Sequence, residues 1–177
     1  AFREELLASV RAPGTAHRNV GNIDTAFASA AKTVEAEYVV PHLSHLQMEP
    51  LAALARVNPD GSAETWAPTQ NPQANRSAVA SFLGISEDKV KCNVTLLGGA
   101  FGRKSKSDFV IEAVYLAKQL KVPVRVQWTR EDDVKHGYYN AVNAQRLRAA
   151  LDAKGTVIGW HHRTAFTPIA ATFTGIT

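Results

Sequence analysis

The residues of this chain best suited to ligand chemistry lie in one run, residues 97–104, with the sequence Leu-Gly-Gly-Ala-Phe-Gly-Arg-Lys. Its three glycines leave backbone N–H groups uncovered, and glycine is common where a chain turns sharply or lets a ligand approach its amides. A strand-like stretch precedes this run and an apolar helical pattern follows it. A bare loop between a strand and a helix, with Arg103 and Lys104 adding positive charge, favours an anionic ligand.

Two well-known phosphate loops do not match this run. The dinucleotide-binding fingerprint needs a glycine two residues before Gly99, where Leu97 stands. The P-loop needs a glycine directly before its Lys-Ser pair, where Arg103 stands. The spacing therefore leaves two alternatives open, a cofactor or anion loop of another kind and a tight turn without a ligand.

Other residue types with possible chemistry give weaker signals. His42, His45 and Glu49 could bind a metal, but no third neutral ligand accompanies them and flanking prolines argue against a helix that would align them. We interpret this segment as a loop that positions a cofactor or satisfies backbone groups. Cys92 is the only cysteine, which excludes a disulfide or a cysteine-only metal site within the chain. We expect Cys92 to be a buried small hydrophobic residue.

The elements that must position these residues mix strand and helix patterns. Apolar periodicity and capping signals predict helices over 2–10, from Asn22 or Asp24 to 31, from Asn71 to Gly84, from Ser107 to 120, and after Thr129. Alternation predicts strands at 33–39, 51–57, 63–67, 90–96, 124–128, 145–151 and 156–166. Strict strand–helix alternation is absent, so we predict an α+β class with mixed sheets and packed helices.

Several side chains have predicted places within these elements. We expect the helix after Ser107 to be central and buried, because it is apolar on more than one side. Glu131, Asp132 and Asp133 suit the first turn of a helix. His161 and His162 must face opposite sides of one strand and so cannot bind one metal together. The helix after Asn71 should have an apolar face formed by Ala74, Ala78, Phe82 and Leu83. We also predict core positions for the three tryptophans, Trp66, Trp128 and Trp160.

Length and composition bound the class of protein. The 177 residues have 45% hydrophobic content, 20% charged content and a net charge of +4. Basic residues are scattered, so we predict no nucleic-acid partner, and no apolar run is long enough to predict a membrane span. The first residue is Ala and residues 169–177 carry no stop signal, so we expect a piece of a longer protein. We predict a peripheral segment at 1–32 and a partial cofactor-binding domain at 33–177. The compartment, bacterial cytoplasm or periplasm, stays open.

Three separated segments, residues 45–50, 66–70 and 97–104, together resemble a known family, and residues 123–133 resemble a fourth of its signatures. The family is that of the molybdopterin-binding large subunits of xanthine dehydrogenases and aldehyde oxidases. The chain looks most like the branch of isoquinoline 1-oxidoreductase beta subunits. The segments come in the family's order, and the resemblance covers roughly residues 33 to 165.

The resemblance implies a molybdenum–molybdopterin cofactor, in the cytosine dinucleotide form, lying against the glycine loop. It implies hydroxylation of an aldehyde or N-heteroaromatic substrate with water as the oxygen source, and electron transfer to iron–sulfur clusters on a partner subunit. Phe101 would lie nearest the metal through its main chain, and His45, Glu49 and Gln70 would support the loop from behind. The cofactor-binding residues that it implies are Gly98, Gly99, Ala100, Phe101, Gly102 and Arg103.

The chain departs from the xanthine-oxidising members at two positions that would line the substrate pocket. Leu43 stands where those members have glutamine, and Ser105 stands where they have glutamate, which favours an aldehyde or an apolar heteroaromatic substrate over a purine. The family's catalytic glutamate lies downstream of anything in this chain. We therefore expect no catalytic residue here and no turnover by the isolated chain. The alternative is a non-catalytic binding or assembly module that keeps the fold without the cofactor.

Overall fold

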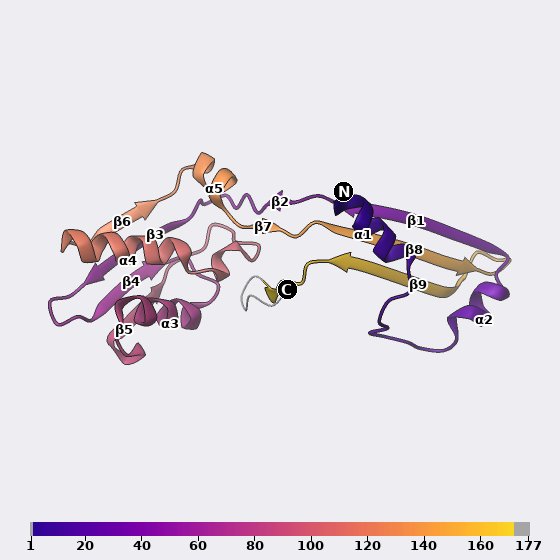
Figure 1. The fold of residues 1–177 in the computed structure, drawn as a ribbon, viewed down its shortest axis with the longest axis horizontal. Helices are drawn as coiled ribbons and strands as arrows, with labels where there is room; N and C mark the ends of the chain where they lie inside the picture. Colours follow the sequence, from indigo (N-terminus) through magenta and orange to yellow (C-terminus); the bar gives the residue numbers. More distant parts are fainter. Residues whose placement is uncertain (1, 172–177) are drawn as a thin grey trace. The chain divides into compact units, whose positions relative to one another are not determined.

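The computed structural model describes residues 2–171 (Figure 1). The chain divides into two compact units, the first formed by Ala1–Leu43 and Asn140–Thr177 and the second by Ser44–Tyr139. Two short paired strands, β2 (Leu43–Ser44) and β7 (Tyr139–Asn140), lie where the chain passes between the units. Both units combine helices with β-sheet, antiparallel in the first unit and mixed in the second, so the predicted α+β class is confirmed.

The second unit is a four-stranded mixed sheet with helices packed on it. The strand order is β5-β4-β3-β6, with β3 antiparallel to β4 and β6 and with β4 parallel to β5. The main elements are β3 (Ala52–Val57), β4 (Ala63–Ala67), α3 (Pro72–Leu83), β5 (Val90–Val94), α4 (Asp108–Leu120), β6 (Val124–Gln127) and α5 (Arg130–His136). Two short 3-10 helices, η1 (Glu87–Lys89) and η2 (Arg103–Ser105), precede β5 and α4.

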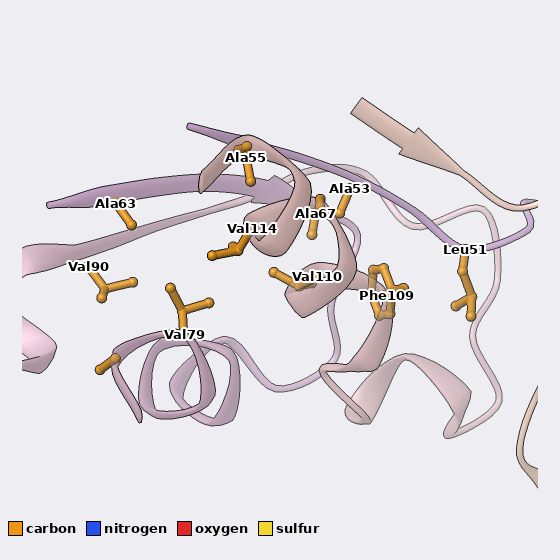
Figure 2. Packing of buried hydrophobic residues seen from close by; sticks show 13 residues of the cluster. Leu51, Ala53, Ala55, Ala63, Ala67, Val79, Val90, Phe109, Val110 and Val114 are labelled. Carbon is orange, nitrogen blue, oxygen red and sulfur yellow. The ribbon is translucent and has the colours of Figure 1, made fainter. Parts of the chain in front are cut away.

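The core of the second unit lies between its sheet and helices α3 and α4 (Figure 2). Phe109, Val110 and Val114 of α4 are fully buried against alanines of β3 and β4, whose small side chains let the helix approach closely. Val79 of α3 completes this layer. Burying each such Val or Phe stabilises the fold by about 1.5–3 kcal/mol, and this core fixes the two ends of the glycine loop.

Local capping signals identified α3 correctly, but the predicted apolar face was only partly right. The side chain of Asn71 accepts a hydrogen bond from Ala74 N at 3.1 Å, and Gly84 ends the helix with a φ of 71°. The buried positions are Asn75, Val79 and Ala80. Phe82 is 39% exposed and packs edge-on against Tyr115 of α4, which is itself 50% exposed, whereas Leu83 packs partly buried against the core as predicted.

The apolar face of α4 was also predicted too broadly. One face is buried, whereas Tyr115, Leu116 and Leu120 are at least 37% exposed, so α4 covers the sheet from one side only. The side chain of Ser107 stands at the predicted cap position but makes no capping hydrogen bond.

Strand β5 is shorter than its alternation predicted. It ends at Val94, and Leu96, which the alternation placed on the buried side, is 95% exposed. Cys92 is half-buried rather than buried, and it packs at the edge of the core. The polar and apolar alternation therefore continues past the last residue that the sheet covers.

The first unit is a three-stranded antiparallel sheet with two helices, α1 (Phe2–Arg11) and α2 (Ile23–Ala28). Its strands are β1 (Lys32–Val40), β8 (Asn143–Leu151) and β9 (Val157–Phe166), in the order β1-β8-β9. Helix α2 is capped by Asn22 and ends at Ala28, three residues before the predicted end. Trp160 was predicted to lie in the core, but it is 59% exposed on the face of β9 away from the helices.

Helix α1 covers one end of this sheet with an apolar cluster of Leu6, Leu7, Val10, Val142 and Ala144. The predicted boundary between residues 32 and 33 stays a prediction, and the part of the predicted domain at 172–177 lies outside the described residues. Across residues 2–171, none of the helices combines the length and the apolar character needed to cross a membrane.

Candidate functional site

The glycine loop has an unusual backbone. Gly99, Phe101 and Gly102 all have positive φ, at 88°, 51° and 96°, whereas Ala100 between them does not. Of these three residues only Phe101 carries a side chain, and a residue with a side chain pays about 1–2 kcal/mol to adopt this left-handed conformation. Phe101 is 72% exposed, so burial of its side chain does not offset this cost. Strained backbone of this kind persists where the surroundings force it, and it is common at ligand sites.

Residues 47–49 lie directly behind this loop. The N–H of Glu49 donates to the carbonyl of Gly98 at 2.9 Å, and the Glu49 carboxylate accepts from the N–H of Gly98 at 3.1 Å. A Cβ atom on Gly98 would lie 2.5 Å from Cβ of Glu49, so no other residue fits there without moving backbone. At Gly99, a Cβ would lie 3.5 Å from Cβ of Gln47. Gly98 therefore lets residues 47–49 pack directly against the backbone of the loop.

The segment Thr69–Gln70 holds the other end of the loop. Gln70 accepts from the N–H of Gly102 at 3.0 Å through its side-chain oxygen, and its own N–H donates to the carbonyl of Lys104 at 3.0 Å. The hydroxyl of Thr69 donates to the same carbonyl at 3.1 Å. The side-chain NH₂ of Gln70 makes no hydrogen bond within residues 2–171.

Lys104 points inward, not towards a ligand. Its side chain is fully buried, and its Nζ donates to Oε2 of Glu49 at 2.6 Å. Burial raises the pKa of Glu49, but the hydrogen bonds from Lys104 and from the N–H of Gly98 outweigh it and hold the pKa below its usual range. The Lys104–Glu49 pair therefore fastens the loop to the segment behind it.

Arg103 is also buried, at 1% exposure, and its guanidinium makes a bidentate pair with Asp108 at 2.9 and 2.6 Å. The guanidinium carbon lies 5.5 Å from the ring centroid of Trp128 and 5.0 Å from that of Tyr138. The sequence predicted that both basic side chains of the loop would add charge to a ligand site. The structure corrects this prediction, because carboxylates of the same unit already neutralise them. Contact of Arg103 with a cofactor stays a prediction.

A buried polar network supports the loop from the side of α5. Asp133, which is 2% exposed, accepts from Nε2 of Gln47 at 2.9 Å and from Arg130 at 2.8 Å. Arg130 also donates to the carbonyl of Gln47 at 2.6 Å. Helix α5 starts after Thr129, as predicted, and the structure adds a capping box between Thr129 and Asp132. Sequence reasoning missed Gln47 and Asp133, because 86 residues separate them.

Three consecutive N–H groups of the loop, those of Gly99, Ala100 and Phe101, have no acceptor within residues 2–171. The φ angles at these residues alternate in sign, and such turns can direct successive N–H groups towards one anion. The groups on either side, at Gly98 and Gly102, are already satisfied by Glu49 and Gln70. The chain therefore fixes the loop at both ends and leaves three donors in its middle.

The remaining predicted residues lie outside this arrangement. His45 donates through Nδ1 to the carbonyl of Tyr138 at 3.0 Å, and His42 donates to that of Asn140 at 2.9 Å. Leu43 belongs to the first unit and is 49% exposed, whereas Ser105 is half-buried in η2 of the second unit. Residues 2–171 contain no cluster of three or more His, Cys, Asp or Glu side chains able to hold a metal ion.

Comparison with known proteins gives a consistent set of matches. Residues 8–168 match the molybdopterin cofactor-binding domain family. The chain is 32% identical over 148 residues to isoquinoline 1-oxidoreductase subunit beta of Brevundimonas diminuta, covering 82% of this chain and 19% of that protein. It is 33% identical over 164 residues to a membrane-bound aldehyde dehydrogenase of Gluconacetobacter polyoxogenes, covering 92% and 21%; the name of that enzyme includes pyrroloquinoline-quinone.

Among solved structures, quinoline 2-oxidoreductase from Pseudomonas putida 86 matches with a TM-score of 0.68 and 25% identity, over 81% of this chain and 18% of that one. The chain spans about a fifth of the length of the relatives that it matches. The resemblance found in its four segments is thus confirmed over most of its length. Those segments meet around the glycine loop, and the chain belongs to the molybdopterin cofactor-binding domain family.

Proposed function

We propose that residues 98–102 hold a molybdenum–molybdopterin cofactor through their main chain. The observation that carries this is the set of three unpaired N–H groups in a loop whose two ends are fixed. Hydrogen bonds from N–H groups to an anionic group are roughly twice as strong as those between neutral groups. Glycine at position 99 also supports the proposal, because it allows the φ of 88° that the loop backbone takes there.

In this proposal each residue of the loop has its own role. Gly99, Ala100 and Phe101 donate N–H groups to the negatively charged cofactor, and Phe101 brings its main chain nearest the metal. Gln70 can add a further donor through its unpaired side-chain NH₂. Gly98, Gly102 and Arg103 keep these groups in place, while Glu49 supports the loop from behind.

The whole protein would then hydroxylate an aldehyde or an N-heteroaromatic compound, and the bound cofactor would supply the oxidation with oxygen from water. Names of the relatives support this class, since they act on isoquinoline or aldehydes. Leu43 and Ser105 are proposed to favour an apolar substrate. The side chains exposed around the loop agree with that preference, because they are large and apolar: Leu46, Met48, Leu96, Leu97 and Phe101.

We infer that this chain supplies one wall of the site and no catalytic residue, so the isolated chain should not turn over. The single cysteine of this chain cannot hold an iron–sulfur cluster, and we propose that electrons leave through an iron–sulfur subunit. Relatives that are named as subunits support a multi-subunit assembly. The cytosine dinucleotide form of the cofactor is the form that we propose.

The test is the cofactor content of the full-length protein isolated with its partner. Molybdenum is measured by mass spectrometry, pterin by fluorescence after oxidation, and the nucleotide by chromatography after acid release. We expect about one molybdenum and one pterin per chain, with cytidine monophosphate released. Pyrroloquinoline quinone in place of molybdenum would overturn the proposal. An assembled complex with neither cofactor would instead support the non-catalytic module.

A further inference from the structure

The helix-facing side of the three-stranded sheet in the first unit carries charged side chains. Strand register places two rows of side chains across the sheet, between the apolar cluster under α1 and the contact with α2. The rows are Glu37, Arg146 and Arg163, and Glu35, Arg148 and His161. A sheet face under two helices is normally apolar, so this charged strip needs another explanation.

A hollow of about 330 Å³ opens at the α2 end of this strip. Two arginines and a histidine line it together with an apolar wall and one acid: Arg148, Arg163, His161, Ile23, Phe27 and Asp24. The guanidinium carbon of Arg148 lies 4.4 Å from the ring centroid of Phe27, so the ring fixes the position of the charge. This volume is at the lower end of the range for ligand pockets and suits a small molecule.

Positive charge exceeds negative charge along the strip. Arg11 pairs with Glu37 at 2.6 Å, and Arg146 and Arg148 share Glu35 at 2.7 and 3.1 Å. Arg163 has no carboxylate partner within residues 2–171, and its guanidinium donates to the backbone carbonyl of Arg11 at 3.0 Å.

The charge of Arg148 is also incompletely satisfied. Its Nε is buried and makes no hydrogen bond in the described part of the chain, although Oε2 of Glu35 lies 3.1 Å away out of line. Burial lowers the pKa of His161, and Arg163, Arg148 and Arg146 lower it further, whereas only Asp24 raises it. The surroundings of His161 are therefore electrically positive.

We propose that this hollow binds a phosphate monoester whose organic group is small and apolar. Guanidinium groups suit phosphate because they offer paired donors with permanent charge. Ile23 and Phe27 would contact the organic group, and Arg148, Arg163 and His161 would face the phosphate. Asp24 opposes the phosphate charge, which predicts that its removal strengthens binding.

The test uses phenyl phosphate as the probe and the ring signals of the histidines, followed by NMR, as the readout. His161 should shift and saturate with added probe. His162 is the internal reference, because it lies on the opposite face of the same strand, near Gln145. Inorganic phosphate should bind more weakly than phenyl phosphate, because it cannot use the apolar wall. Equal binding of the two would overturn the assigned ligand class.

Variants make the test specific. Arg163→Gln should weaken phenyl phosphate binding by about tenfold or more, and Arg163→Lys by less, because charge is kept but the paired donors are lost. Asp24→Asn should tighten binding several-fold, and Asn22 rather than Asp24 caps the helix there, so the fold should be kept. Arg125→Gln, in the second unit, is the matched control and should bind like the parent. An unchanged His161 signal, or equal affinity in all four variants, would refute the site.

Discussion

At the scale of single residues, the glycine loop depends on side chains that look like surface residues in the sequence. Arg103 and Lys104 are among the most buried side chains in the described chain, and each is paired with a carboxylate of the second unit. Removing one partner of such a pair leaves the other charge buried and unpaired. This lowers the free energy of unfolding by more than the loss of a solvent-exposed ion pair does. Energetic tests at these positions therefore report directly on how the loop is held.

Lys104→Met should lower the free energy of unfolding by about 2 kcal/mol. This loss is smaller than that for a fully buried ion pair, because the Glu49 side chain is 37% exposed. Lys91→Met is the matched control, because its pair with Glu64 is exposed on the lysine side, at 71%. That control should change the free energy by about 0.5 kcal/mol or less. Urea unfolding of both variants provides the measurement, and equal losses would contradict the buried anchor.

The pH dependence of stability should carry the signature of Glu49. Its folded-state pKa is lowered, so the ionised carboxylate stabilises the fold above its unfolded pKa of about 4.3 and this contribution is lost as the pH falls through the lower folded value. The difference in unfolding free energy between the parent and Glu49→Gln should therefore shrink on acidification from neutral pH. Chemical unfolding across that range measures it, and a difference that stays constant would rule out the pair as its source.

At the scale of elements, the sequence contained strong signals for where helices and turns begin and end. Asn71, Pro72 and Gly84 mark both ends of α3, and Thr129 with Asp132 marks the start of α5, because these residues act on their own backbone neighbours. Burial faces were less predictable, as Phe82 and Trp160 show, since they depend on distant packing partners and on which strands are covered.

The candidate site was predictable to a similar extent. The glycines and the supporting Glu49 and Gln70 could be named from the sequence, because they lie in recognisable segments. The direction of the Arg103 and Lys104 side chains could not, because their partners are set by tertiary contacts. The contact of Gln47 with Asp133 joins distant segments and had no local signal.

Two residues at equivalent cap positions should differ in their effect on stability. Asn71→Ala should cost about 1 kcal/mol, because the side chain accepts a hydrogen bond from Ala74 N at the start of α3. Ser107→Ala should cost much less, because Ser107 stands at the start of α4 without a side-chain capping bond. Thermal unfolding of the pair tests this, and a larger loss for Ser107→Ala would contradict the geometry at both helix starts.

At the scale of the whole molecule, the sheet of the first unit exposes an apolar face opposite its helices. Val34 and Trp160 lie in register across Ala149, and Tyr38 and Phe166 lie on the same side, each at least 47% exposed. An apolar surface of this kind marks a site of contact or drives association.

The isolated chain should therefore self-associate at high concentration. Trp160→Lys should raise the concentration at which this occurs, because it places a charge in the middle of the apolar face. Light scattering over a concentration series provides the measurement, with Ile169→Lys, at an exposed position outside the sheet, as the control. A parent chain that stays monomeric at high concentration would contradict this prediction.

The central claim is that the bare backbone of the glycine loop receives a molybdenum-bearing cofactor. Gly98→Ala tests it most directly, because the added Cβ would meet Cβ of Glu49 at 2.5 Å and displace the loop from the segment behind it. Gly14→Ala is the matched control, since a Cβ there meets nothing within 4 Å.

Molybdenum per chain is measured in both full-length variants with the partner subunit, after circular dichroism shows that the fold is kept. We predict a loss of about tenfold or more for Gly98→Ala, equal to about 1.4 kcal/mol of binding free energy, and parent-like content for Gly14→Ala. Parent-like molybdenum content in a folded Gly98→Ala protein would contradict the claim.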